Sequence, residues 1–197
     1  GNGIHPNEWV RPEEKRQMPK ILSEAAIAQY ERDGFYHPLR AMDADEVASC
    51  RRDVERVEQE NLDDIGGAFR HKPHLLLRSL DAAVRNEKIL DAVEDLIGPD
   101  IFVWASLFFT KNIGDTRYVG WHQDSTYFGL RPHEHVTAWL ALSESTADSG
   151  CLEFLPENLT QLKHKDNAME HSVNGGKQKI IEGFDPSQAV LAPIEPG

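Results

Sequence analysis

The stretch IFVWASLFF, residues 101–109, divides the chain into two halves with different sequence patterns. It is rich in β-branched and aromatic residues and apolar at consecutive positions, which is typical of a strand covered on both faces. Further strand-like segments follow it, and Gly, Pro, Asp and Asn punctuate the gaps between them. The predicted strands after 101–109 are RYVGWHQD (117–124), HVTAWLALSE (135–144), GCLEFLP (150–156) and QAVLAPIEP (188–196).

Residues 21–98, before this stretch, carry helical signals instead. Ser23 is a candidate N-cap for a first helix that Gly34 would end. Asp43 and Glu46 fit a capping box at the start of a second helix, over 44–60. Its apolar face recurs at helical spacing and comprises Val47, Cys50, Val54 and Val57. The segment NEKILDAVEDLIG (86–98) predicts a third helix, with Ile89, Leu90, Val93, Leu96 and Ile97 on one face.

Helices followed by a run of strands indicate an α+β domain, mainly β. The strand part would be a sandwich or a jelly roll, with the helices packed outside it. A length of 197 residues fits one domain with a sizeable core. We therefore predict a polar arm at 1–20, a helical part at 21–98 and a strand part at 99–197.

Composition and charge narrow the possible partners and location. A net charge of −12 argues against binding to nucleic acid or to anionic membrane surfaces, because both favour clustered Lys and Arg. No apolar run approaches the roughly 18 residues of a membrane span. Cys50 and Cys151 are too few and too far apart for a disulfide framework, and no signal peptide is visible. We expect a cytoplasmic protein with two reduced thiols.

His122 and Asp124, within WHQDSTYF (121–128), form a His-x-Asp pair on one of the predicted strands. Residues i and i+2 of a strand point to the same face, so the imidazole and the carboxylate would lie side by side. Such a pair supplies two ligands of the 2-His-1-carboxylate triad, which leaves positions on Fe(II) open for a co-substrate and O₂. The pattern alone leaves a buried, hydrogen-bonded pair without a metal as the alternative.

Other histidines give weaker signals. His164 and Asp166 form a second His-x-Asp, but its neighbours in LKHKDNAMEH (162–171) are polar and indicate a solvated surface loop. His133 and His135 lack the Glu that would follow them in a cupin metal motif, so they are assigned to the start of a strand.

The segment from Phe108 to Pro156 resembles the phytanoyl-CoA dioxygenase family of Fe(II)- and 2-oxoglutarate-dependent oxygenases. The resemblance extends over nearly all of residues 22–197. The matching features occur in the same order as in the family, and they are Lys111, WHQD (121–124), Tyr127-Phe128, Arg131-Pro132, Trp139, Gly150-Cys151-Leu152 and Pro156. The resemblance implies a cupin-like double-stranded β-helix and a hydroxylase that acts on a small organic substrate.

Carried over by position, the resemblance implies that His122 and Asp124 bind Fe(II). It makes Lys111 a contact for a 2-oxoglutarate carboxylate, Tyr127 a residue facing substrate or cosubstrate, and Trp139 a wall of the cosubstrate pocket. On the residues alone, Lys111 could be a solvated strand end and Trp139 could be core packing. Substrate identity does not carry over, because Glu157-Asn158-Leu159 stands where the family often has Gly-Ser-His.

The resemblance also implies that the strand part is incomplete at its C-terminal end. Family members place the second His ligand, and then the Arg that pairs with 2-oxoglutarate, after an apolar strand and a Pro-Gly-Asp turn. QAVLAPIEPG (188–197) fits that strand and the start of that turn. We expect this chain to bind iron poorly, with His164 or His171 as the first candidates for a substitute ligand. An exposed sheet edge would make a homodimer plausible.

Two other functions remain open on the sequence. A non-catalytic jelly-roll module would bind a ligand or partner without turnover, and a metal hydrolase or isomerase would keep its activity without O₂.

Overall fold

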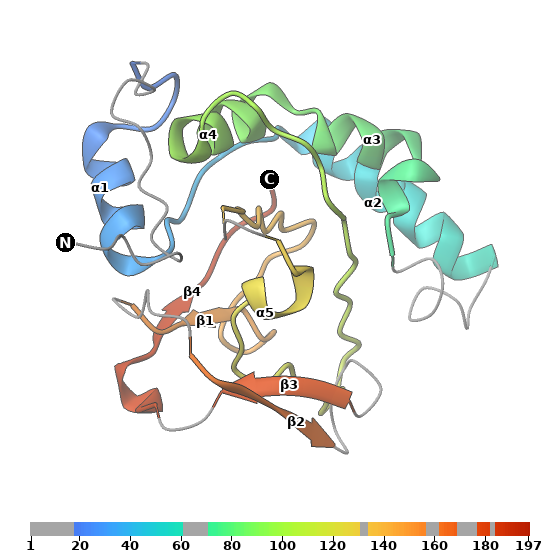
Figure 1. Cartoon of the computed structure of the whole chain (residues 1–197). Helices are drawn as coiled ribbons and strands as arrows, with labels where there is room; N and C mark the ends of the chain where they lie inside the picture. Colours follow the sequence, from blue (N-terminus) through green and yellow to red (C-terminus); the bar gives the residue numbers. More distant parts are fainter. Residues whose placement is uncertain (1–17, 61–70, 131–133, 157–161, 169–176, 182–183) are drawn as a thin grey trace.

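The computed structural model describes residues 18–60, 71–130, 134–156, 162–168, 177–181 and 184–197. Figure 1 shows helices α1 to α4 in an arc along one side of the molecule, with the strands on the other side. The helices are α1 (Glu24–Asp33), α2 (Ala44–Glu60), α3 (Arg78–Val84), α4 (Glu87–Ile97) and α5 (Ser125–Phe128), with short 3-10 turns at Pro73–Leu75 and Pro186–Gln188.

The predicted helix ends are confirmed by their capping contacts. Ser23 accepts a hydrogen bond from the backbone amide of Ala26, and Gly34 closes α1 in the left-handed conformation. At α2, Asp43 and Glu46 exchange the two hydrogen bonds of a capping box, both 2.9 Å. The side chain of Asn86 caps α4 by accepting from the amides of residues 88 and 89. Helix α3 carried no signal strong enough to predict it.

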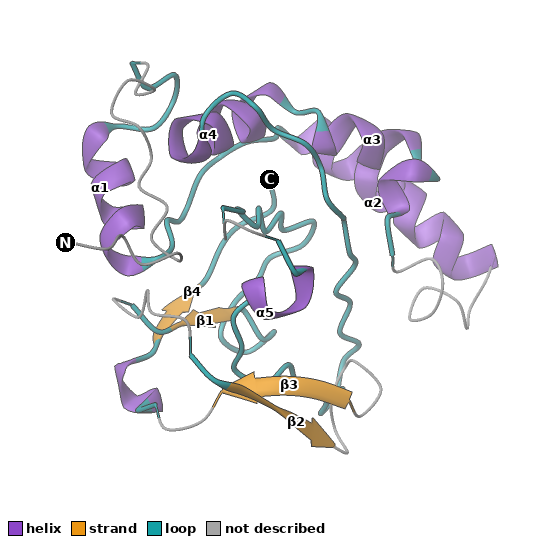
Figure 2. Cartoon of the chain, viewed as in Figure 1, coloured by secondary structure: helices purple, strands orange, loops and turns teal. Residues whose placement is uncertain are grey.

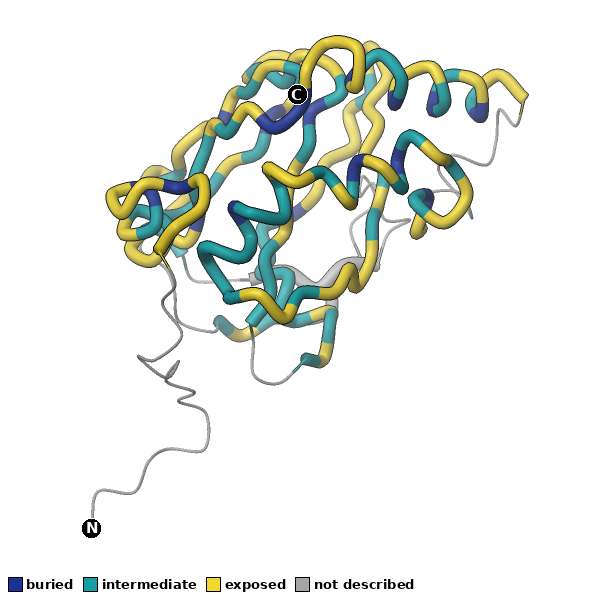
Figure 3. The backbone as a smooth tube through the Cα atoms, turned by 90° about the horizontal axis from the view of Figure 1, so that it is seen from above, coloured by how far each residue is buried: buried dark blue, intermediate teal, exposed yellow. Residues whose placement is uncertain are grey.

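The core lies between the helices and the extended segments beneath them. All four predicted apolar residues of α2 are buried, and they are Val47, Cys50, Val54 and Val57. One cluster joins α2 and α3 through Cys50, Leu80 and Ala83, and Phe108, Leu140 and Leu142 pack against it. Figure 3 shows buried positions recurring between exposed ones along these helices. The second half of the chain is therefore attached to the helical layer by apolar contact.

The strands form two antiparallel pairs, drawn in orange in Figure 2. β1 (Leu152–Phe154) pairs with β4 (Val190–Ala192), as two of the predicted strands allow. β2 (His164–Ala168) pairs with β3 (Lys177–Ile181) over five residues, which the sequence did not predict. Among the described residues, no helix is long and apolar enough to cross a membrane.

Three other strand predictions differ from the structure. Segment 101–109 is extended, but among the described residues it makes only an isolated bridge, between Leu107 and His71. Its side chains are not covered on both faces, since Phe102 is 69 % exposed and Trp104 47 % exposed. Neither 117–124 nor 135–144 forms a strand. Local composition can indicate an extended backbone, but a strand also needs a hydrogen-bonded partner, which composition does not specify.

Residues 190–197 join the two halves of the molecule. Beyond β4, Ile194 exchanges backbone hydrogen bonds with Ser145, and the amide of Gly197 donates to the carbonyl of Ala141. The carbonyl of Gly197 accepts from the amides of Ala41 and Met42, at 2.8 and 3.0 Å. Gly197 has φ +85°, and a Cβ there would lie 2.6 Å from the carbonyl oxygen of Met42. This close approach therefore requires glycine.

Candidate functional site

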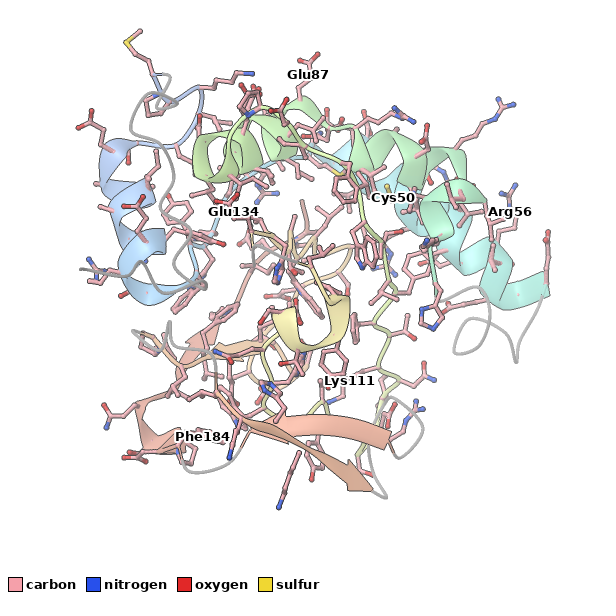
Figure 4. The ribbon with its side chains drawn as sticks, viewed as in Figure 1. Cys50, Arg56, Glu87, Lys111, Glu134 and Phe184 are labelled. Atoms are coloured by element: carbon pink, nitrogen blue, oxygen red, sulfur yellow. The ribbon has the colours of Figure 1, made fainter. Side chains whose placement is uncertain are left out.

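The His-x-Asp pair lies in a turn that leads into α5, and the predicted strand at 117–124 is wrong. Asp124 already has helical backbone angles, and Gly129 ends the helix with φ +64°. Aromatic contacts hold both ends of the turn. The ring of Trp121 lies 5.2 Å from that of Phe184, which Figure 4 labels, and Phe128 contacts the rings of Trp104 and His135. The turn is therefore packed against several other segments.

His122 and Asp124 nevertheless face each other, as predicted. His122 Nε2 lies 3.1 Å from Asp124 Oδ1, and the side chains are 26 % and 36 % exposed. His122 Nδ1 donates to the carbonyl of Gly120 at 2.8 Å, and Thr137 donates to Asp124 Oδ2 at 2.6 Å. Each side chain is thus fixed by a second partner on the side away from the pair. The sequence reasoning missed Thr137, because a single Thr in HVTAW carries no signal of its own.

The electrostatics favour a charged carboxylate at Asp124. Burial lowers the pKa of His122, but hydrogen bonds to Asp124 and Gly120 outweigh it, and the net shift raises the pKa. The hydrogen bond with His122 lowers the pKa of Asp124 against the opposing effect of burial, and Thr137 and the nearby His135 add to this. The carboxylate is therefore held in the charged form that a cation requires.

The geometry fits two neighbouring positions around a metal ion. Adjacent ligands that lie about 2.1 Å from an octahedral ion are about 3.0 Å apart. Nε2 of His122 and Oδ1 of Asp124 are separated by 3.1 Å. The bond from Nδ1 to Gly120 leaves Nε2 as the ring nitrogen available to a metal, which is the usual arrangement of a histidine ligand.

The described residues do not supply a third ligand in place. Within the described ranges, no group of three or more His, Cys, Asp or Glu side chains is arranged to hold a metal ion. His133 and His171 lie outside the described residues. Of the candidate metal ligands in the described part of the chain, the structure thus brings together His122 and Asp124.

His164 does not lie in a surface loop, contrary to the sequence-based prediction. It begins β2 and is half-buried against the turn that carries the metal-binding candidates. Its Nε2 accepts from the backbone amide of Gln123 at 2.8 Å, and Nδ1 lies 3.1 Å from Thr126 Oγ1. The polar neighbours of His164 suggested solvent exposure, but the pairing of β2 with β3 places this end of the strand at the site.

The other candidates lie at different distances from the pair. The ring of Tyr127 meets that of His122 edge-on at 5.6 Å, so these two are in contact. Trp139 packs on Phe109 at 5.3 Å and remains 37 % exposed. Lys111, labelled in Figure 4, is exposed, and its ammonium group approaches Gly150.

Gly150 shapes the surroundings of Lys111. It has φ +82°, and a Cβ built on it would lie 3.0 Å from Lys111 Nζ. The charge of Lys111 also contributes to lowering the pKa of Asp115 to about 2, although hydrogen bonds from Arg117 are the main cause. The ammonium group of Lys111 thus lies close to the backbone of Gly150, at the end of the 146–150 turn.

A family model described as phytanoyl-CoA dioxygenase matches residues 30–197, which include every site residue named above. The chain belongs to the phytanoyl-CoA dioxygenase family. This confirms the resemblance drawn from the ordered motifs between Lys111 and Pro156.

Two curated relatives share part of the chain. A phytanoyl-CoA dioxygenase domain-containing protein 1 homolog of Caenorhabditis briggsae is 27% identical over 139 residues, which are 64% of this chain and 46% of that protein. A protein of Stutzerimonas stutzeri, named probable alpha-ketoglutarate-dependent hypophosphite dioxygenase, is 28% identical over 176 residues, which are 75% of this chain and 58% of that protein. The chain therefore spans about half the length of these relatives.

Proposed function

We propose that the protein is an Fe(II)- and 2-oxoglutarate-dependent dioxygenase that hydroxylates a small organic substrate. The observation that carries this proposal is the His122–Asp124 pair, whose donor atoms lie 3.1 Å apart in a chain of this family. Membership in the family and the name of the Stutzerimonas relative support 2-oxoglutarate as the cosubstrate. The name of the Stutzerimonas relative mentions hypophosphite, whereas the Caenorhabditis relative is named only for its domain, so we propose only the class of the substrate.

We further propose that the fold is a double-stranded β-helix with the N-terminal helices outside. The family supports this assignment, and the antiparallel pairs β1–β4 and β2–β3 are compatible with it. The helices α2 and α3 already pack against the segments that contain Phe108 and Leu140.

The iron would be held by His122 and Asp124 together with a ligand outside the described residues. We propose that this ligand is a second histidine supplied by a part of the protein beyond these 197 residues, together with the Arg that pairs with 2-oxoglutarate. The support is that the described residues hold two donors of three, and that the relatives are about twice as long as the match. We expect the 197-residue chain to bind iron weakly.

The remaining site residues would serve the cosubstrate and substrate. We propose that Lys111 binds a carboxylate of 2-oxoglutarate through its charge, that Tyr127 faces substrate or cosubstrate beside His122, and that Trp139 forms a pocket wall. The bound iron would supply O₂ activation, while the protein would orient the reactants and exclude water.

Hydroxylation is proposed over halogenation because of Asp124. Halogenating members of this oxygenase class have Ala or Gly at the carboxylate position, which leaves room for chloride on the iron. Asp124 occupies this position and is held by His122 and Thr137. A chlorinated product from the full-length enzyme in the presence of chloride would contradict this part of the proposal.

The experiment is a succinate-release assay with Fe(II), 2-oxoglutarate and O₂, on the chain and on its full-length form. We expect O₂-dependent succinate from the full-length form, loss of this activity in His122→Ala, and no change in His71→Ala, an exposed histidine away from the pair. Turnover that persists without O₂ would identify a hydrolase or isomerase. Binding without turnover in the full-length form would identify a non-catalytic module.

Location and assembly complete the proposal. We propose that the protein binds neither nucleic acid nor anionic membrane surfaces, on the basis of its net charge of −12. We also propose a cytoplasmic location, on the basis of Cys50 and Cys151 as free thiols. We also propose that exposed backbone edges permit a homodimer, which light scattering would detect.

A further inference from the structure

A hydrogen-bonded clasp joins Gln123 to the start of β2. The backbone amide of Gln123 donates to His164 Nε2 at 2.8 Å, and the amide of Leu162 donates to Gln123 Oε1 at 2.8 Å. Nδ1 of His164 lies 3.0 Å from the carbonyl of Leu162 and 3.1 Å from Thr126 Oγ1. The two hydrogen bonds span 39 and 41 residues of sequence, and each of the two segments donates one of them.

The hydrogen-bond partners of His164 determine which of its two ring nitrogens carries the proton. A backbone amide can only donate, so Nε2 must be the acceptor and carries no proton. A backbone carbonyl can only accept, so Nδ1 carries the proton and points it to Leu162. The neutral Nδ1–H tautomer is the form of the ring that satisfies both contacts. Nε2, the atom that a metal would need, is therefore already used.

We propose that His164 is a positioning residue for the metal pair and not its third ligand. Gln123 is the residue between His122 and Asp124, so its peptide groups connect directly to both ligand backbones. Fixing its amide fixes the turn that aims the two side chains at each other. The half-buried ring of His164 shields this bond from water. This inference rests on the proposed function, because a positioning role has meaning only if the pair binds metal.

The first test uses the metal-free 197-residue chain. Two-bond ¹H–¹⁵N spectra of the histidine rings are expected to show His164 as the neutral Nδ1–H tautomer. An Nε2–H tautomer, a tautomer mixture or an imidazolium at neutral pH would overturn the clasp. This measurement needs no substitution and so does not depend on any variant folding.

The second test compares His164→Leu with His164→Gln, and uses His71→Gln as the control. In Gln, Oε1 replaces Nε2 as an acceptor, whereas Leu keeps only the bulk of the ring. We expect His164→Leu to speed hydrogen exchange of the Gln123 amide at least 10-fold and to shift the ring signals of His122. His164→Gln should restore most of this protection, and His71→Gln should change nothing. Equal exchange in the Leu and Gln variants would show that packing alone matters and would reject the proposal.

Mn(II) titration links the clasp to the metal centre. Broadening of the His122 signals reports Mn(II) binding without any turnover, and we expect roughly 10-fold weaker binding in His164→Leu, as for residues that orient metal ligands. Equal affinity in the two chains would contradict a positioning role. If Mn(II) leaves His122 unaffected in the 197-residue chain, the titration is repeated with the full-length form, and absence of binding there would reject the proposed metal centre. The tautomer and exchange results still decide the clasp.

Discussion

The hydroxyl of Thr137 donates a 2.6 Å hydrogen bond to Oδ2 of Asp124, the carboxylate oxygen that does not face His122. The bond therefore orients the carboxylate so that Oδ1 remains directed at His122. Thr137 comes 13 residues after Asp124 along the chain. Thr137, which no sequence motif indicated, thus helps to set the geometry of the candidate metal site.

Replacing Thr137 by Val should weaken metal binding while it preserves shape. Val is close to Thr in volume but cannot donate, so Asp124 would lose the bond that holds its orientation. We expect about 10-fold weaker Mn(II) binding, measured by calorimetry, because outer partners of metal ligands are typically worth 10- to 100-fold. Thr116→Val, at an exposed threonine, is the matched control. An unchanged affinity in Thr137→Val would remove Thr137 from the site.

Lys111→Met should reduce the affinity for 2-oxoglutarate. The variant keeps the length of the side chain and its contact with Gly150 but removes the charge that would pair with a carboxylate. We expect about 10-fold weaker binding in the presence of Mn(II), allowing for the exposure of Lys111. Lys88→Met, at an exposed lysine on α4, should bind normally. If both variants bind 2-oxoglutarate equally well, Lys111 is a solvated surface residue.

Leu80 and Leu75 offer a direct test of the helical core. Leu80 is 7 % exposed within the cluster around Cys50, whereas Leu75, five positions earlier, is 69 % exposed. Leu80→Ala should cost about 2–3 kcal/mol of the free energy of unfolding through lost burial and a cavity. Leu75→Ala should change it by less than about 0.5 kcal/mol. Urea denaturation of the two variants measures both values, and equal costs would show that the core lies elsewhere.

The lowered pKa of Asp95 predicts that the stability of the fold depends on pH. Burial raises its pKa, but hydrogen bonds from the backbone amides of Leu22, Lys20 and Ile21 outweigh this and lower the pKa. A carboxyl group with a lowered folded-state pKa stabilises the fold above its unfolded pKa of about 3.9, and this contribution disappears as pH falls through the folded value. The loss is therefore confined to acid below about pH 4.

Asp95→Asn should remove this contribution at neutral pH. We expect a cost of about 1–2 kcal/mol at pH 7, which shrinks as pH falls through the lowered pKa of Asp95, because the unsubstituted Asp95 is then protonated too. Asp148→Asn, at an exposed position, should cost little at either pH. A difference between Asp95→Asn and the unsubstituted chain that does not depend on pH would contradict the argument.

Helices α1, α2 and α4 could be predicted from the sequence because their signals are local, whereas α3 and α5 were not predicted. Ser23, the Asp43–Glu46 box and Asn86 lie within three residues of the amides they cap, so their chemistry is visible in a short window. The segments that contain β1 and β4 were predicted, but strand pairing could not be, since a ladder depends on a partner far away in sequence. Segment 101–109 has strand composition but makes only one bridge in the described structure, whereas the polar residues 164–168 pair over their whole length.

The site divides in the same way. His122 and Asp124 were found because the two residues of this motif are only two positions apart in the sequence. Thr137 was missed because it reaches the motif from a distant segment and carries no pattern of its own. His164 was named as a possible substitute ligand but was assigned to a surface loop, because its contact with Gln123 spans 41 residues of sequence. The mutual approach of His122 and Asp124 was correctly predicted, although a turn before α5 produces it and not the alternation of a strand.

The contacts of residues 195–197 have a consequence for the order of folding during synthesis. Arg40 pairs with Glu195 across 155 residues of chain and also donates to the carbonyl of Pro196, while Ala41 and Met42 bind the carbonyl of Gly197. A ribosome that adds 5–20 residues per second needs roughly 10–30 s to cover that separation. The segment between α1 and α2 is synthesised this long before residues 195–197. The amides of Ala41 and Met42 therefore lack these hydrogen-bond partners while the rest of the chain is being made. Such long-range closure also slows folding, because loop entropy is lost before these contacts form.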